Sequence, residues 1–558
     1  MGVPGFFLWL MKKYDKQFIF DNLPSTPEGK ELKCDYLLID TNCLIHPMCF
    51  KVLENVNTTN ILDLENKMIK QVIEYIEYLV DHVKPVKGTY IAIDGVAPCA
   101  KMKQQRYRRY KSISDKVLWD KIKKKYNKPV SNTIWNNSAI SPGTEFMYKL
   151  HNYIINWMKN KNVIYSSYLT PAEGEHKLLQ FIRDNSNKSK YYNYVIYGLD
   201  ADLIFLALTS DPKANIHLLR ESNEILKSEN IILKYVDIQL MRESVLYTIS
   251  LYITDIVLDK DDVIKDFIFI CYLLGNDFLP HIHSVDIYDN GLDLLIEKYS
   301  ETFIELYMTT NYNCYLINNK NINMAFFKLF IFKLSLEEEN SLKIKYNKKK
   351  KYKHLPDDPY DKEIFKIENL VFKINDPIQL GSDNHIDWRK RYYKYYFDTD
   401  NPDEISKKIV LYYLSGLKWT TEYYFDKCPS WEWYYPFDNP PFLSDIYNFL
   451  VDINSINFEL SKPLEPYSQL LIVLPPQLNY LLPKNLRKLM IDNKSSLTYL
   501  YPYEFEQDFL NKKKYWMGIP KLPSLDINDV RYYYLKYKNE LSKDELERNN
   551  YLDVISNV

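Results

Sequence analysis

Glycine is scarce in this sequence of 558 residues, of which only 13 are glycine. Because the average protein has about 7% glycine, each glycine that remains here is expected to have a backbone reason. Long apolar runs are also absent, and none approaches the roughly 20 residues that a membrane span needs. The N-terminal run MGVPGFFLWLMKK lacks the basic segment of a signal peptide. We therefore expect an intracellular protein with no membrane association, placed in the cytoplasm, with the nucleus or a viral origin as alternatives.

Zinc-ligand spacing and an excess of charge of either sign are absent as well. The seven cysteines include no CxxC pair, and an odd number without zinc spacing indicates free thiols in a reducing compartment. Lysine and arginine number 72 against 73 aspartates and glutamates, which gives a net charge of -1. A polyanionic partner must therefore meet a local basic patch. The length of the chain predicts two or more packed regions.

Three short apolar runs predict strands, and an aspartate stands directly after each of them. The runs cover residues 36–39, 89–93 and 194–199, and the aspartates are Asp40, Asp94 and Asp200. Strands that alternate with helical patterns predict an α/β fold with a mostly parallel sheet flanked by helices. In such a fold the loops at the carboxyl ends of the strands build the functional site.

Four further carboxylates stand at the ends of predicted elements. They are Glu173 and Glu175 at the start of a helical pattern, Asp202 two residues after Asp200, and Asp277 after the helical run 263–274. Four glycines lie within two residues of these acidic side chains, namely Gly95, Gly174, Gly198 and Gly275. This placement suggests tight turns that present carboxylates. Hard divalent cations prefer oxygen ligands, so the seven carboxylates together indicate a shared metal site.

Each of these carboxylates, taken alone, has a simpler explanation. Aspartate at a strand end commonly starts a turn, and the run from Thr170 to Glu173 fits a capping box with proline at the first helical position. Glu173 and Glu175 are also two residues apart, and such residues do not share a regular helix face. They would have to converge from the first turn or hold two different ions. For the set of seven, a metal site is the better explanation.

A basic helical face follows Asp94 in the run AKMKQQRYRRYKS. If this run is a helix, one face of it carries Lys101, Gln105, Arg108 and Arg109. Ammonium, guanidinium and amide groups on one face match phosphate oxygens. A solvated charged face is the ordinary explanation for such a run. Because the run begins next to a candidate metal ligand, we favour a phosphate site.

Residues 343–360, KIKYNKKKKYKHLPDDPY, predict an exposed basic linker between domains at 1–342 and 361–558. A basic arm for nucleic acid is a secondary interpretation of the same run. The region after it is rich in aromatic residues, as in GLKWTTEYYFDKCPSWEWYYPF. Buried aromatic side chains are the ordinary explanation. Tryptophan and tyrosine at this density also suit stacking on nucleobases.

These segments together resemble the eukaryotic 5′→3′ exoribonuclease (Xrn) family. The matching runs before the linker are MGVPGFF, DTNCLIH, AIDGVAPCAKMKQQRYRRYKS, SPGTEFM, PAEGEHKLLQFIR, GLDADLIFLAL and GNDFLPH. After the linker they are GLKWTTEYYF, PSWEWYYPF, QLLIVLPP and YPYEFEQDFLNKKKYWMGIPKLP. The resemblance implies a PIN-like nuclease core at 1–342. It also implies that an aromatic-rich, mainly helical second region at 361–558 packs around this core and closes the active site.

The resemblance implies two Mg²⁺ ions, which Mn²⁺ can replace, held by seven carboxylates. This set carries over to Asp40, Asp94, Glu173, Glu175, Asp200, Asp202 and Asp277. It further implies that a 5′-monophosphate binds to Lys101, Gln105, Arg108 and Arg109. His46 would stack on the first base, and one tryptophan of the second region would close its other side, from among Trp419, Trp431 and Trp433.

Some residues depart from the family pattern. Gly5 and Leu8 stand where basic residues are usual, Cys43 replaces a small glycine, and His283 stands where proline is common. None of these changes removes a ligand, so they bear on substrate contacts and not on the chemistry. The long C-terminal extensions of the large family members are absent, so the sequence looks like a minimal catalytic core.

The expected function is therefore processive 5′→3′ exoribonucleolysis. The substrate would be single-stranded RNA with a 5′-monophosphate, degraded to nucleoside 5′-monophosphates by two-metal-ion hydrolysis. A structure-specific 5′ DNA nuclease of the flap type shares the acidic cluster, but it gives no reason for the aromatic region. A non-catalytic RNA-binding scaffold would be signalled by missing carboxylates, and all seven are present. We expect a monomer, and the sequence names no protein partner.

Overall fold

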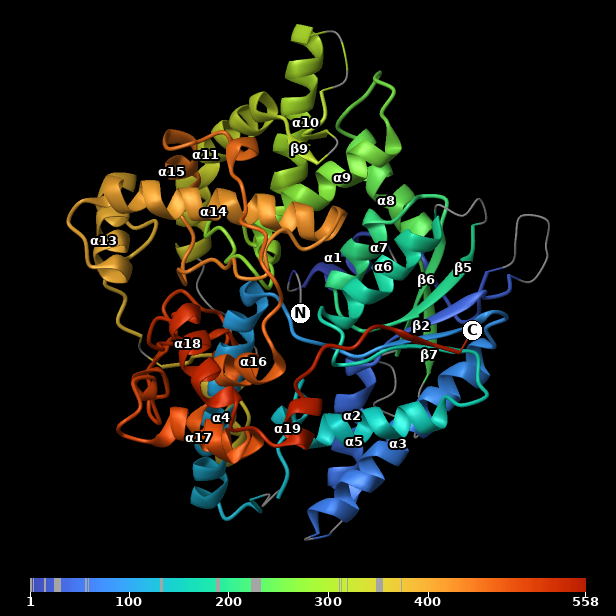
Figure 1. The fold of residues 1–558 in the computed structure, drawn as a ribbon. Helices are drawn as coiled ribbons and strands as arrows, with labels where there is room; N and C mark the ends of the chain where they lie inside the picture. The colour runs from blue at the N-terminus through green and yellow to red at the C-terminus, as the bar shows by residue number, and fades with distance from the viewer. Residues whose placement is uncertain are drawn as a thin grey trace.

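A sheet with a parallel centre organises the first half of the protein (Figure 1). The computed structural model describes the chain except for residues 1–2, 4, 15–16, 25–31, 56–57, 59, 131–133, 187–190, 222–231, 311, 313, 319, 348–354, 373 and 558. Eight strands of the described chain form the sheet, in the order β1-β7-β6-β5-β2-β3-β4-β12. They are β1 (Ile19–Phe20), β2 (Tyr36–Asp40), β3 (Gly88–Ala92), β4 (Val163–Ser166), β5 (Asn193–Tyr197), β6 (Asn215–Glu221), β7 (Leu233–Asp237) and β12 (Ile555–Ser556). The central strands β2 to β6 are parallel, and β1, β7 and β12 pair antiparallel at the edges.

Helices cover both faces of this sheet, because its strands are apolar on both. One face carries side chains such as Leu38 and Ile196, which pack against α1, α6, α7, α8 and α9. The other face carries side chains such as Ile39 and Val195, which pack against α2, α3 and α5. These helices are α1 (Phe6–Lys13), α2 (Asn42–Asn55), α3 (Ile61–Val83), α5 (Glu145–Trp157), α6 (Gly174–Ser186), α7 (Asp202–Thr209), α8 (Ile238–Ser250) and α9 (Lys260–Cys271).

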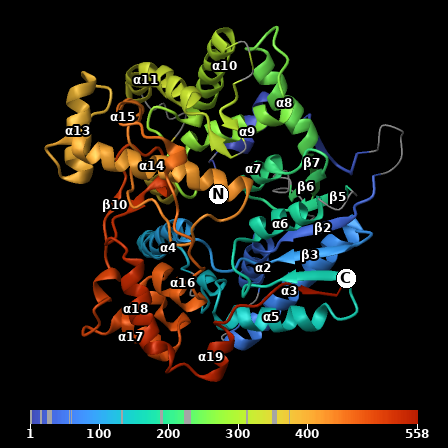
Figure 2. The same ribbon diagram turned by 45° about the horizontal axis from the view of Figure 1, so that its top comes forward.

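The second half of the chain is mainly helical. Its helices are α10 (Gly291–Thr310), α11 (Met324–Asn347), α12 (Pro359–Glu368), α13 (His385–Phe397), α14 (Pro402–Phe425), α15 (Leu443–Asn448), α16 (Pro466–Val473), α17 (Lys484–Ile491), α18 (Ile527–Lys538) and α19 (Lys543–Glu547). The helix α4 (Cys99–Lys125) leaves the sheet and packs with α16, α17 and α18 in a hydrophobic cluster of its own (Figure 2). The predicted fold class, a mostly parallel sheet with an aromatic-rich helical region, is confirmed.

The three predicted strands are present, but two of them end earlier than predicted. β3 ends at Ala92 and β5 ends at Tyr197, whereas the sequence predicted strand as far as Ile93 and Leu199. The chain must leave β5 early because it turns there toward α7, which already begins at Asp202. The run before Asp277 also differs, since its last three residues form a 3-10 turn, Tyr272–Leu274, after α9.

The predicted exposed linker at 343–360 is wrong at both of its ends. α11 continues to Asn347, and α12 already begins at Pro359. The side chain of Lys345 is only 7% exposed, and its ammonium lies 3.2 Å from the carboxylate of Asp286, a partner that the run of lysines does not reveal. Residues 348–354 lie outside the described residues. The division into domains at 1–342 and 361–558 stays a prediction, although β12 from the second half pairs with β4 of the sheet.

The predicted N-terminal helix over residues 1–20 is shorter than expected. α1 covers Phe6–Lys13, and the residues Ile19–Phe20 form β1 instead, because they pair with β7 at the edge of the sheet. Residues 1–2, 4 and 15–16 lie outside the described residues. Within the described chain, none of the helices combines the length and the apolar character that crossing a membrane would require.

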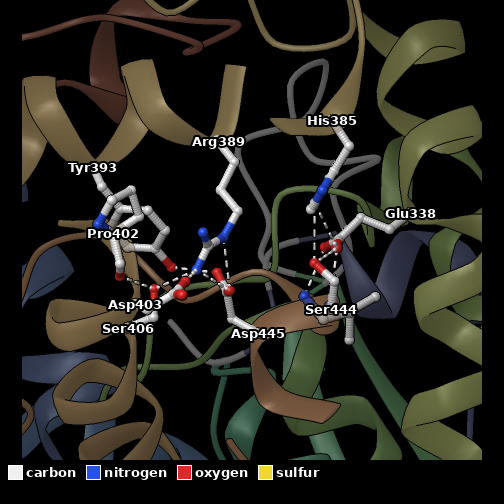
Figure 3. A network of polar contacts seen from close by, with 10 residues as sticks. Glu338, His385, Arg389, Tyr393, Pro402, Asp403, Ser406, Ser444 and Asp445 are labelled. Carbon is white, nitrogen blue, oxygen red and sulfur yellow. Dashed lines mark hydrogen bonds and ion pairs between the residues drawn. The ribbon is translucent and has the colours of Figure 1, made fainter. Parts of the chain in front are cut away.

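A buried polar network holds the helices around α15 together (Figure 3). The carboxylate of Asp445 is almost fully buried and accepts from Arg389 Nε at 2.8 Å, and Nη2 of the same guanidinium forms an ion pair with it at 2.7 Å. The hydroxyl of Tyr393 donates to its other oxygen at 2.6 Å. Beside it, Glu338 accepts hydrogen bonds from two backbone N–H groups at the start of α15. The network thereby joins α11, α13 and α15.

We expect Arg389→Ala to lower the free energy of unfolding by about 3–5 kcal/mol, because it leaves the buried carboxylate of Asp445 without its cation. Asp403→Ala is the matched control, since Asp403 pairs with the same guanidinium at 2.8 Å but its side chain is 67% exposed. For an exposed pair we expect a change below about 1 kcal/mol. Urea unfolding measures both variants. Equal effects of the two substitutions would contradict this ranking.

Candidate active site

The seven predicted carboxylates gather at the edge of the sheet where the parallel strands end. Asp40 ends β2, Asp94 follows β3, and Glu173 and Glu175 stand at the start of α6. Asp200 lies between β5 and α7, Asp202 is the first residue of α7, and Asp277 follows the 3-10 turn after α9. The carboxyl ends of parallel strands meet at one edge, which brings these turns together. Each of the seven carboxylates either shifts the pKa of another member of the set or has its own pKa shifted by one. The structure therefore forms one cluster from distant parts of the sequence.

Short-range contacts hold Asp40 and Asp94 in place. The thiol of Cys43 donates to Asp40 Oδ2 at 3.0 Å, and the amide of Asn42 donates to Asp94 Oδ2 at 2.8 Å. The backbone N–H of Gly174 donates to Asp94 Oδ1 at 2.6 Å. A Cβ at Gly174 would lie 2.8 Å from Asp40 Oδ1. Glycine is therefore needed there so that the first turn of α6 can approach both carboxylates.

Glu173 and Glu175 converge because only one of them is on the helix. α6 begins one residue after Glu173, so the rule for two residues on a regular helix does not apply to this pair. The capping box predicted from Thr170 is wrong, because its hydroxyl donates to the carbonyl oxygen of Leu552 at 2.7 Å. The hydroxyl of Tyr423 on α14 donates to Glu173 Oε2 at 3.0 Å. The second half of the chain thus contacts the cluster directly.

Lys101, in the first turn of α4, lies within the carboxylate cluster. Its Nζ is 2.7 Å from Glu173 Oε1 and also pairs with Asp277, whose other oxygen accepts from Gln104. Burial alone would raise the pKa of Asp277, but the ammonium of Lys101 holds that pKa below its usual range. The sequence placed Lys101 with the phosphate-binding residues, and the structure places it against the carboxylates. Gln104 was missed because it lies beside the predicted helical face.

Burial and mutual repulsion oppose the ionisation of several carboxylates. Burial, followed by the charge of Asp94, raises the pKa of Asp40 to about 8, and burial with the charge of Asp277 raises the pKa of Asp202 to about 7. Burial raises the pKa of Glu175 well above its usual range. Three buried oxygens have no hydrogen-bond partner, namely Asp40 Oδ1, Glu175 Oε2 and Asp202 Oδ1. Unpartnered carboxylate oxygens in one cluster fit hard divalent cations.

His176 is a further candidate ligand, which the sequence reasoning missed. Ligand atoms of Glu173, Glu175 and His176 all lie within 4.8 Å of one another. The imidazole stacks on the ring of Tyr423 at a centroid distance of 3.7 Å, and its Nε2 has no hydrogen-bond partner. Burial lowers the pKa of His176 well below its usual range, so the ring is neutral, as a metal ligand must be. Its place beside both glutamates in the run EGEH was the available signal.

A cavity of about 300 Å³ adjoins the cluster at Asp94. Four predicted substrate-binding residues line it, namely His46, Gln105, Arg108 and Arg109. The Nη1 atom of Arg109 is buried without a hydrogen-bond partner. Burial and the neighbouring charge of Arg108 lower the pKa of Arg109 to about 10, so the guanidinium is still charged at neutral pH. The cavity thus offers an unsatisfied cationic donor next to the carboxylates.

Neutral polar groups complete the lining of this cavity. Burial and the two guanidinium groups lower the pKa of His46 to about 4, so its imidazole is uncharged at neutral pH and free to stack. Gln469 of α16 donates to Gln105 Oε1 at 3.3 Å and accepts from the backbone N–H of Ala97 at 3.0 Å. Sequence reasoning missed Gln469, because it comes from a helix more than 350 residues away along the chain. Further lining residues are Asn42, Ser112, Asn137 and Ser138.

The three candidate stacking tryptophans have different environments. Trp419 is fully buried between Tyr423 and Trp433, and its indole N–H donates to the carbonyl of Ser430 at 2.9 Å. Trp419 is therefore part of the core, and its candidacy as a stacking residue is wrong. Trp433 and Trp431 are half-buried. The described lining of the cavity includes none of the three, so the second stacking residue stays a prediction.

Two family models match the chain and together cover most of it. The model of the XRN 5′-3′ exonuclease N-terminus matches residues 1–222, and that of the Xrn1 helical domain matches residues 257–370 and 360–555. The chain belongs to the XRN family. The two matches include the parallel strands of the sheet, all seven carboxylates and the lining of the cavity.

Named XRN relatives are similar over the whole of this chain. Human 5′-3′ exoribonuclease 1 is 29% identical over 100% of this chain and 35% of its own length. The 5′-3′ exoribonuclease 2 of Debaryomyces hansenii is 28% identical over 98% of this chain and 71% of its own length. The 5′-3′ exoribonuclease 2 of Arabidopsis thaliana is 28% identical over 99% of this chain and 69% of its own length. The chain thus spans 35% of the human relative and 69–71% of the other two. XRN membership indicates a 5′-3′ exoribonuclease, a hydrolase.

In EDTA, Glu175→Gln is expected to raise the Tm of the protein, because a neutral amide relieves repulsion among the buried carboxylates. Added Mn²⁺ should raise the Tm of the unsubstituted protein by binding the folded state, and should raise that of the variant less. Scanning calorimetry measures both. Glu422→Gln, in a half-buried glutamate of α14, is the control and should keep the full Mn²⁺-dependent shift. An unchanged Mn²⁺-dependent rise in Tm in Glu175→Gln would show that Glu175 is not a metal ligand.

Proposed function

We propose that this chain is a processive 5′→3′ exoribonuclease that degrades single-stranded RNA with a 5′-monophosphate to nucleoside 5′-monophosphates. One observation carries the proposal. The cluster of seven carboxylates shares a wall, at Asp94, with a cavity that two arginines line. Cleavage at the first internucleotide bond requires a metal site next to a cationic cavity that holds the terminal phosphate. The gathering of all seven carboxylates argues against a non-catalytic scaffold.

The residues that would hold two divalent cations, Mg²⁺ or Mn²⁺, are the members of the carboxylate cluster. They are Asp40, Asp94, Glu173, Glu175, Asp200, Asp202 and Asp277, and the three unpartnered oxygens among them support this assignment. When bound, two such ions supply a water of lowered pKa and stabilise the charge on the leaving oxygen. Seven carboxylates outweigh two divalent ions by three negative charges. Lys101 offsets part of that excess, because it pairs with two members of the cluster.

The cavity would receive the first nucleotide. Arg109 and Arg108 meet the terminal phosphate, with Gln105 held in position by Gln469. The neutral ring of His46 is placed to stack on the base. A cavity of about 300 Å³ suits one nucleotide with a monophosphate, so a triphosphate or a cap is rejected by size.

The chemistry is a hydrolysis of the phosphodiester between the first and second nucleotides. Water adds to that phosphorus and the bond from phosphorus to the 3′-oxygen of the first nucleotide breaks. The 3′-oxygen takes up a proton and leaves as part of a nucleoside 5′-monophosphate. The phosphate stays on the second nucleotide, which becomes a new 5′-monophosphate end. This end is again a substrate for the same cavity, which is the physical basis for processive action.

Asp202→Ala and Glu175→Gln are expected to abolish hydrolysis in Mg²⁺ while RNA binding largely survives. Metal ligands stabilise the transition state, whereas affinity rests on cationic and stacking contacts. Release of mononucleotides from a 5′-labelled RNA measures hydrolysis, and filter binding measures the affinity for RNA. Turnover close to that of the unsubstituted protein, in either variant, would show that these carboxylates are not part of the reaction.

Arg109→Ala is expected to slow the hydrolysis of 5′-monophosphate RNA by about ten- to a hundredfold, because a charge-assisted hydrogen bond contributes roughly 1.5–3 kcal/mol. The lower rate on 5′-hydroxyl RNA should change little, since that substrate never makes the contact. Lys116→Ala, an exposed cation further along α4, is the control and should leave the ratio of the two rates unchanged. A fixed ratio in Arg109→Ala would disprove the phosphate assignment, even if the protein is a nuclease.

A further inference from the structure

The turn before Glu173 has an unfavourable backbone conformation. Ala172 has a φ of 100°, in the left-handed region that residues with a Cβ rarely adopt. Its N–H donates to the carbonyl of Val96 at 3.0 Å, and its carbonyl accepts from the N–H of Gly95 at 2.9 Å. Because these partners directly follow Asp94, the loops of two carboxylates are joined at a residue whose conformation its surroundings must maintain.

The other side of this turn is held by residues 549–557, which we call the strap. Figure 1 shows it in red, running from α19 to the edge of the sheet. The hydroxyl of Thr170 donates to the carbonyl of Leu552 at 2.7 Å, and the N–H of Leu552 donates to the carbonyl of Leu169 at 3.2 Å. A Cβ at Gly95 would clash with the carbonyl oxygen of Thr170. The turn is therefore enclosed between Gly95 and the strap.

The strap is itself anchored at both ends. Asn549 is 2% exposed, its Oδ1 accepts from the N–H of Tyr467 at 2.9 Å, and its Nδ2 donates to Glu465 Oε2 at 2.7 Å. At the other end β12 pairs with β4, and Asn557 Nδ2 donates to the carbonyl of Met158 at 3.0 Å. Anchors on both sides fix the middle of the strap, where it meets the turn.

The hydroxyl of Thr170 bonds the strap and not the start of α6. A threonine shortly before a helix commonly caps it by accepting from a backbone N–H of the first turn. Here the N–H of Gly174, the first residue of α6, donates to Asp94 Oδ1 instead. The start of α6 therefore depends on contacts from outside the helix, on the cluster side and on the strap side.

We propose that the strap acts on the metal site through Thr170, which is a positioning residue for Glu173. The bond from Thr170 to the strap keeps Ala172 in its left-handed conformation, and this conformation aims the next residue, Glu173, at the carboxylate cluster. Thr170 itself is not a metal ligand. Groups that orient ligands from behind change metal affinity about ten- to a hundredfold when they are removed. The inference rests on the proposed metal site and gives residues 549–557 a role in it.

The test is Mn²⁺ binding to the whole protein without RNA, followed by the electron paramagnetic resonance of free Mn²⁺. Thr170→Val keeps the shape of the side chain and removes the donor, so it should weaken Mn²⁺ binding by about ten- to a hundredfold. Thr170→Ser retains the hydroxyl and should bind Mn²⁺ as the unsubstituted protein does. Thr302→Val is the matched control, because Thr302 is fully buried on α10 and its hydroxyl donates to the carbonyl of Lys298 at 2.7 Å. It should lower the Tm and leave Mn²⁺ affinity unchanged.

A double variant separates positioning from a general loss of stability. Glycine adopts positive φ without steric cost, so Ala172→Gly alone should keep the affinity for Mn²⁺. Added to Thr170→Val, it should recover most of the affinity that the first substitution removes. Excess Mn²⁺ should restore kcat in Thr170→Val, with the KM for RNA unchanged, because the substitution acts on ion binding and not on RNA contacts.

Unchanged Mn²⁺ affinity in Thr170→Val would overturn the proposal. So would a loss of affinity that either Thr170→Ser or Ala172→Gly fails to recover. Binding is measured without hydrolysis, so a protein in which Thr170 governs Mn²⁺ affinity but which cleaves no RNA would contradict the proposed function and leave the positioning role intact. An unsubstituted protein that binds no Mn²⁺ would refute the metal site and the positioning role together.

Discussion

The close approach of seven carboxylates is the constraint on which the rest of this structure depends. Their mutual repulsion and burial raise the pKa values of Asp40 and Asp202, so the apo fold holds groups that would separate if they were free. Three contacts oppose the repulsion: the N–H of Gly174 on Asp94, the amide of Asn42 on Asp94, and the ammonium of Lys101 on Glu173 and Asp277. None of these contacts supplies partners for the oxygens that remain unpaired. A cluster of this kind carries unfavourable electrostatic energy, which protonation or bound cations relieve.

The helical half shields the carboxylate cluster from water. The strands alone place the carboxylates at an open sheet edge, where water would reach them. α14 covers that edge through Tyr423, whose hydroxyl donates to Glu173, and α16 reaches the neighbouring cavity through Gln469. Arg106 of α4 donates to the carbonyl of Leu500 at 2.6 Å and so ties this helix to the same half. The aromatic residues of that region therefore mainly form hydrophobic core, as the full burial of Trp419 illustrates.

The sequence predicted the parts of the site that depend on local pattern. Strand ends follow from short apolar runs, so Asp40, Asp94 and Asp200 were found from the residues themselves. Contacts across the chain were not predictable in this way. Gln104 donates to Asp277, which lies far from it along the chain. Trp419 likewise packs edge-on against Phe278, a residue distant in sequence. The capping box at Thr170 failed for the same reason, since its hydroxyl finds a partner at Leu552.

The direction of α4 links these observations. One flank carries Gln105 and Arg109 toward the phosphate cavity, and the other carries Gln104 to Asp277. Lys101, one turn earlier, lies between them within the carboxylates. Because residues three and four apart share a helix side, a single rigid helix sets the spacing of all three places at once. A kink in α4 would therefore alter both the phosphate cavity and the charge balance of the cluster. That coupling gives a physical reason for packing the first half of this 27-residue helix, through Cys99, Met102 and Ile113, into one hydrophobic cluster with α16, α17 and α18.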